Sequence, residues 1–177
     1  QSIGSAPTLS ELSSLREGSG PVPQRLQLPT LGMTDAPVTS VGVEPNGDME
    51  IPGAREVGWY RYGPTPGAEG SSVLAAHIAF NGVDGVFRSL AQMAPGDVFS
   101  VDYDDGSSRD CVVVGLRQYS KIEAPLDELF DRSGPPRLVL ITCGGTFNRG
   151  LDSYDDNVVV VSVPLDFAFK GSGAASS

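Results

Sequence analysis

The chain of 177 residues is poor in the residues that build metal sites and nucleic-acid interfaces. It has a single histidine, His77, and two cysteines, Cys111 and Cys143, whose distant positions do not match a zinc-binding motif. Lysine and arginine number 12 against 22 acidic residues, and the basic residues are scattered. Because phosphate binding needs a basic stripe, the net charge of −10 argues against a nucleic-acid partner. We therefore expect no metal and no cofactor, and interpret the acidity as a source of solubility.

Other common signatures are also missing. No apolar run approaches the roughly 18 residues of a membrane span, and no charged-then-apolar signal precedes the first elements. There is no Walker loop and no G-x-S-x-G nucleophile elbow. We therefore interpret the chain, which starts at Gln1, as the soluble portion of a longer protein.

Glycine and proline are abundant, with 22 and 14 residues, which favours short elements joined by turns. Alternating or apolar segments predict strands near residues 25–29, 57–62, 72–77, 97–103, 111–117, 138–142 and 157–163. Asn46-Gly47 predicts a turn between Val41–Val43 and Met49–Ile51, and Asp104–Gly106 predicts a second hairpin. Helices are predicted at residues 86–93 and, as a single turn, at 125–130. This pattern indicates an all-β domain, a closed or nearly closed barrel.

The two ends of the chain differ from this domain. Thr8–Glu11 has the spacing of a capping box and predicts a short amphipathic helix that Gly18 ends. The tail from Gly171 to Ser177 is low in complexity and is expected to be disordered. The predicted organisation is an N-terminal helix and linker (1–22), a folded domain (23–168) and a disordered tail (169–177).

The most informative segment is Leu138–Gly145 (LVLITCGG), an apolar run in which Cys143 is followed by two glycines. We expect the strand to end there and to present Cys143 where the backbone turns away. His77 ends another predicted strand, so the fold could form a thiol–imidazole pair for acyl transfer. The alternatives are that His77 is structural and that Cys143 fills the core. Cys111, within an apolar strand, is expected to pack as a small apolar residue.

Three blocks of sequence resemble one family. They are Val57–Pro64 (VGWYRYGP); Ser72–His77 (SVLAAH) with Gly85–Leu90 and Pro95–Asp97 after it; and Leu140–Gly145 (LITCGG) with Tyr154–Val160 (YDDNVVV) after it. In this order and spacing they are similar to bacterial sortases, most closely the actinobacterial class F type, over about residues 25–167.

The resemblance implies a closed eight-stranded β-barrel and a membrane-anchored cysteine transpeptidase. Cys143 is then the nucleophile that attacks the Thr–Gly bond of an LPXTG-like sorting signal, and His77 is its catalytic partner. Thr142 matches the residue that helps to orient the substrate. The family arginine is expected where this chain has Asp155, so we predict that Arg149 fills its role. Arg61 or backbone amides are the alternative.

The same resemblance implies the partners. These are surface proteins with a C-terminal LPXTG-like signal, and an amine of a peptidoglycan precursor or a pilin lysine. The protein is then expected at the extracellular face of the bacterial plasma membrane, attached through an N-terminal anchor that precedes Gln1. The alternatives are a binding module of the same fold with impaired catalysis, and a hydrolase that releases the acyl group to water. The predicted helix near Thr8 lies between membrane and barrel, or covers the active-site groove as a lid.

Overall fold

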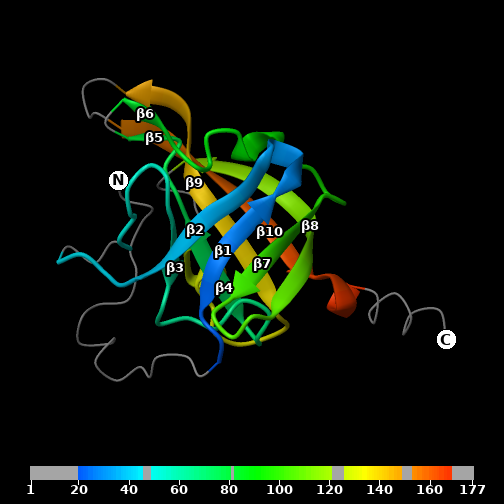
Figure 1. Cartoon of the computed structure of the whole chain (residues 1–177). Helices are drawn as coiled ribbons and strands as arrows, with labels where there is room; N and C mark the ends of the chain where they lie inside the picture. Colours follow the sequence, from blue (N-terminus) through cyan, green and yellow to red (C-terminus); the bar gives the residue numbers. More distant parts are fainter. Residues whose placement is uncertain (1–19, 46–48, 81, 121–125, 149–152, 169–177) are drawn as a thin grey trace.

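The computed structural model describes residues 20–45, 49–80, 82–120, 126–148 and 153–168, without the side chains of 80, 120, 126–127, 143–148 and 153–156. Eight strands close into a barrel in the order β1-β2-β3-β4-β9-β10-β8-β7 (Figure 1). The predicted closed eight-stranded barrel is thus confirmed. The barrel strands are β1 (Pro23–Leu28), β2 (Met33–Val41), β3 (Val57–Tyr60), β4 (Ser71–Ala75), β7 (Val98–Tyr103), β8 (Ser108–Ser120), β9 (Arg137–Asn148) and β10 (Ser153–Pro164).

The remaining elements are short. Strands β5 (Ala79–Phe80) and β6 (Val83–Asp84) form a separate two-stranded sheet, which Figure 1 shows at the same end of the molecule as the end of β9 and the start of β10. The short helices include η1 (Pro29–Leu31), η2 (Leu90–Gln92) and α2 (Leu126–Leu129), and residues 165–168 form a further helical turn after β10. No helix in the described part of the chain is long and apolar enough to cross a membrane.

Most sequence expectations for this domain are confirmed. The β7–β8 hairpin turns at Gly106, whose φ of 84° favours glycine. The single turn of α2 is also present. The helix predicted for residues 86–93 is wrong, because only η2 forms and Ala91 is exposed. The amide of Phe87 instead donates to the carbonyl of His77, which holds this segment against the end of β4.

The turn predicted at Asn46-Gly47, the N-terminal helix and the tail lie outside the described residues. The segments on either side of that turn are joined by an isolated bridge between Val43 and Met49, and the amide of Glu50 donates to the carbonyl of Gly42 over 3.1 Å. The segment after Met49 then leads to β3, which pairs in parallel with β2.

Between Leu138 and Thr142, strand β9 is buried on both faces, which explains the continuous apolar sequence there. Leu138 and Leu140 point into the barrel, whereas Val139 and Ile141 belong to a second cluster. The interior cluster includes Leu26, Leu28, Trp59, Leu74, Phe87, Leu90, Phe99, Val101, Val158 and Val160. The second, outer cluster comprises Val41, Met49, Tyr60, Val73, Ala75, Leu129, Val139, Ile141 and Val159. Leu129 of α2 and Met49 thus pack against the outer face of β4, β9 and β10.

Candidate active site

The parallel pairing of β4 with β9 brings the two residues of the predicted pair to one level. Ser71 to Ala75 pair with Arg137 to Ile141 at a constant offset of 66 positions. Contact continues past the end of β4, where the amide of Ala76 donates to the carbonyl of Ile141 over 3.2 Å. The same offset places His77 level with Cys143. In a parallel sheet, residues at one level on adjacent strands are about 4.8 Å apart.

A side-chain hydrogen bond fixes this level. The hydroxyl of Thr142 donates to the carbonyl oxygen of Ala76, and Thr142 is 1% exposed. The bond joins the residue before Cys143 to the residue before His77. Because the Thr142 hydroxyl is used in this way, the side chain stabilises the relative position of the two strands.

His77 is buried, with 5% of its surface exposed. Burial lowers its pKa from 6.5, whereas hydrogen bonds to the backbone of Pro52 and Ile51 act in the opposite direction. Its own carbonyl accepts from the amide of Phe87 over 3.2 Å. The segment before β3 therefore holds the ring of His77, and the segment after β6 holds its backbone. Because its pKa is lowered from 6.5, His77 is mainly neutral at pH 7.

Cys143 lies within β9 and not at its end. The expectation that the glycines stop the strand is wrong, because β9 continues to Asn148 and pairs with β10 as far as Ser153. Pairing with a long neighbouring strand outweighs the local preference of glycine for turns. A register shift between Tyr154 and Asp156 accommodates the irregularity in this part of the ladder.

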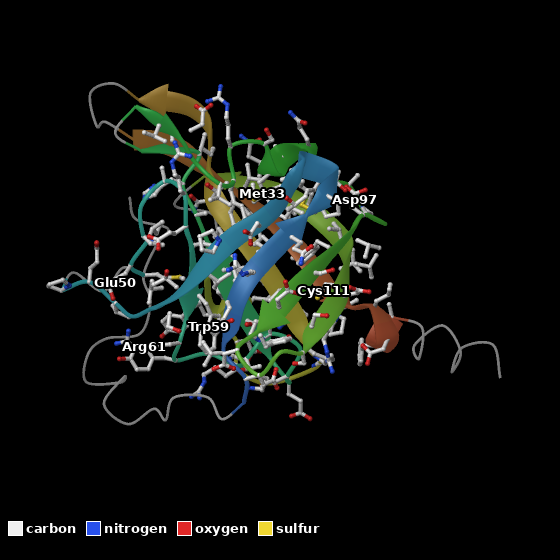
Figure 2. All side chains as sticks on the ribbon, in the orientation of Figure 1. Met33, Glu50, Trp59, Arg61, Asp97 and Cys111 are labelled. Atoms are coloured by element: carbon white, nitrogen blue, oxygen red, sulfur yellow. The ribbon has the colours of Figure 1, made fainter. Side chains whose placement is uncertain are left out.

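Arg149 and Arg61 are the two arginines considered for a role beside Cys143. Arg149 lies outside the described residues, so its role stays a prediction. The pairing of β3 with β4 places Arg61 level with Ser72, five residues before His77, which is about 16 Å along a strand. There its guanidinium donates to the hydroxyl of Tyr62 over 3.0 Å and lies 4.9 Å from that ring. Figure 2 shows Arg61 near the end of the barrel opposite β5 and β6.

Cys111 is a buried free thiol and is 1% exposed, as the sequence predicted for a packing residue. Burial raises its pKa to about 12. Figure 2 shows it on β8, within the barrel wall. It is therefore poorly suited to act as a nucleophile.

A residue that the sequence analysis did not single out lies on the other side of Cys143. In the antiparallel pairing of β9 with β10, Asn157 is the direct partner of Cys143, and in the pairing of β10 with β8 it is the partner of Tyr119. Asn157 is fully buried. The signal in the sequence is an amide side chain directly before a run of four valines.

Within the part of the chain that the structure describes, no cluster of three or more His, Cys, Asp or Glu side chains could hold a metal ion. The acidic residues around the β7–β8 turn have other partners. Asp104 accepts from the amide of Val22 over 3.0 Å, and Asp105 accepts from the amide of Ser107 over 2.9 Å.

Comparison with known proteins identifies the family. A model of the sortase domain matches residues 26–165, so the chain belongs to the sortase domain family. No curated protein sequence matches it. The general part of the sequence prediction, a sortase, is thus confirmed.

Solved sortase structures share the fold at low sequence identity. Sortase C-1 from Actinomyces oris is 22% identical, with a TM-score of 0.62, and the match covers 90% of this chain and 84% of that one. Sortase A from Corynebacterium diphtheriae is 17% identical, with a TM-score of 0.60, covering 82% and 61%. Sortase C1 of GBS pilus island 1 is 19% identical, with a TM-score of 0.59, and this chain covers 63% of its length.

Proposed function

We propose that the protein is a cysteine transpeptidase that cleaves an LPXTG-like sorting signal between Thr and Gly and transfers the acyl group to an amine. The observation that supports this most directly is the parallel pairing of β4 with β9, whose register, continued two residues past Ala75, brings His77 level with Cys143. Membership of the sortase domain family supports the same reaction class.

In the proposed reaction, His77 takes the proton of the Cys143 thiol, and the resulting thiolate attacks the carbonyl carbon of Thr in the signal. The C–N bond to Gly breaks, His77 returns the proton to the leaving amine, and a thioester remains on Cys143. An incoming amine then attacks the thioester, forms a new amide bond and releases the thiol. A neutral His77, favoured by its lowered pKa, suits the first of these proton transfers.

The developing negative charge on the carbonyl oxygen needs donors. We propose that Arg149 supplies one of them, because the chain has an acid at position 155 where related sequences of this type have arginine. Thr142 contributes by fixing the level of Cys143 against His77, as its bond to Ala76 supports.

The partners proposed for this reaction are surface proteins with an LPXTG-like signal and an amine of a peptidoglycan precursor or a pilin lysine. The site of action proposed is the extracellular face of the bacterial plasma membrane. The assignment to class F rests on the three sequence blocks, since the solved structures named above belong to classes C and A.

The test is mass spectrometry of an LPXTG peptide mixed with the protein and a glycine or amine acceptor. We expect cleavage after Thr, joining of the acceptor, and a thioester adduct on Cys143, all of which Cys143→Ala abolishes. Arg149→Ala is expected to lower the rate by about 10²-fold or more.

Two other results would support the alternative functions. Cleavage without incorporation of the amine would identify a hydrolase. Absence of both adduct and product, across several related motifs, would favour a binding module of the same fold, for which Asp155 in place of arginine is the supporting observation.

A further inference from the structure

Three polar residues of β9 and β10 are fully buried in the described part of these strands, and Asn157 differs from the other two, Thr142 and Ser162. The hydroxyl of Ser162 donates to the carbonyl of Leu138 over 2.8 Å, and that of Thr142 donates to the carbonyl of Ala76. In contrast, Oδ1 and Nδ2 of Asn157 are both buried, and neither has a hydrogen-bond partner in the described structure. An unpaired buried amide is destabilising, whereas an apolar side chain of similar shape is not.

The position of Asn157 opposite Cys143 indicates a role for its carboxamide. Asn157 lies directly opposite Cys143, and residues opposite each other in an antiparallel pair have Cβ atoms about 4.5–5.5 Å apart. His77 lies level with Cys143 on the other side, in the chain that continues β4. Cys143 therefore has His77 at its level on one side, in the chain that continues β4, and the unpaired carboxamide of Asn157 on the other, in β10.

A carboxamide offers two N–H donors, and an ionised sulfur is a much stronger acceptor than a neutral thiol. We propose that Asn157 is a positioning residue for Cys143, whose side-chain N–H donates to the sulfur once His77 has taken its proton. This rests on the proposed function, in which Cys143 is the nucleophile. It assigns a partner to the buried amide in the ionised state of the site.

The charged and titratable groups around this position make such a donor valuable. On β10, Asp155 and Asp156 directly precede Asn157, and the backbone of Asp156 is paired with Gly144. From the other strands come His77 beside β9 and, on β8, Tyr119 opposite Asn157 and the exposed Arg117 opposite Val159. A neutral donor next to Cys143 favours the thiolate without adding a charge.

The test measures the rate of alkylation of the folded protein by iodoacetamide as a function of pH, followed by intact mass. Cys111 is buried and does not compete, and Cys143→Ala verifies the labelled site. We expect Asn157→Leu to raise the midpoint of the profile by about one pH unit, a tenfold loss of thiolate below the midpoint. Asn157→Asp, which removes the donors and adds a negative charge, is expected to raise it further.

Ser162→Ala is the matched control, because Ser162 is equally buried on the same strand but already hydrogen-bonded. It is expected to leave the midpoint unchanged. An unchanged midpoint in Asn157→Leu would overturn the proposal, provided that the variant melts cooperatively. If Asn157→Leu does not fold, the smaller Asn157→Ala, which also removes the donors without adding a charge, decides by the same readout.

Alkylation needs no peptide, so the two proposals can fail separately. A midpoint that depends on Asn157 in a protein that never cleaves the signal would remove the proposed function and support the positioning role. A protein that cleaves the signal with the same alkylation midpoint in all variants would remove the positioning role alone.

Discussion

Gly85 is the position at which an added Cβ is expected to displace the candidate site most. A Cβ on Gly85 would lie 1.8 Å from the carbonyl oxygen of His77 and 2.4 Å from its carbonyl carbon. Real Cβ contacts stay above 3.0 Å, so Gly85→Ala requires a backbone displacement of about 1.2 Å. The amide of Gly85 also donates to the carbonyl of Ile78 over 2.7 Å, so the glycine cannot move away without breaking a bond.

Two effects of this displacement can be estimated. Overpacking costs about 1–3 kcal/mol of unfolding free energy, or roughly 2–4 °C in Tm for each kcal/mol in a chain of this size. A misplacement of about 1 Å in a catalytic group can lower the rate by about 10²-fold. We therefore expect Gly85→Ala to fold with a lowered Tm and to lose about two orders of magnitude in peptide cleavage.

The assay is cleavage of an LPXTG peptide together with thermal unfolding followed by circular dichroism. Gly115→Ala on β8 is the control, since a Cβ there has no atom within 4 Å. Gly115→Ala is expected to retain both activity and Tm. Wild-type activity in Gly85→Ala would show that the position of the His77 backbone does not limit the reaction.

Three further predictions concern Thr142, His77 and Cys111. Thr142→Val leaves the carbonyl of Ala76 without its donor and should lower the unfolding free energy, measured by chemical denaturation, by about 1–3 kcal/mol. Thr142→Ser keeps the hydroxyl and should lower the unfolding free energy less. Equal losses in the two variants would contradict this reason. Because burial lowers the pKa of His77, the unfolded chain binds a proton at this imidazole more readily than the folded protein does. Wild type should therefore lose stability relative to His77→Gln as pH falls below about 6.5. An NMR titration midpoint of the imidazole above 6.5 would refute this prediction. Cys111, with its pKa raised to about 12, should resist alkylation at pH 9 until denaturant is added. Rapid labelling of the folded Cys143→Ala protein would contradict the burial of this thiol.

Local sequence patterns were sufficient for much of the barrel. The alternation in residues 97–103 and the turn at Gly106 predicted the β7–β8 hairpin, because in an antiparallel hairpin the partners are close in sequence. The same reasoning failed for residues 86–93. There the helical spacing of Phe87 and Leu90 arises from packing into the barrel, and the backbone is fixed by a bond to His77.

The candidate site was predicted in part. The thiol and the imidazole were identified from their places in the sequence and from the resemblance to sortases. The continuation of β9 past Cys143 was missed, because two glycines predict a break unless a long partner strand is present. Asn157 was missed because its burial and lack of a partner exist only in the folded sheet.

The sequence by itself determined the kind of domain and the chemical groups available to it. Turn residues, apolar periodicity and the scarcity of histidine and cysteine are local properties that can be read without coordinates. Only the tertiary structure decided that β4 pairs in parallel with β9, residues 66 positions apart, and that β10 covers the other edge of β9. Those pairings depend on backbone hydrogen bonds and burial between distant segments, and they alone bring His77, Cys143 and Asn157 to one level of the barrel wall.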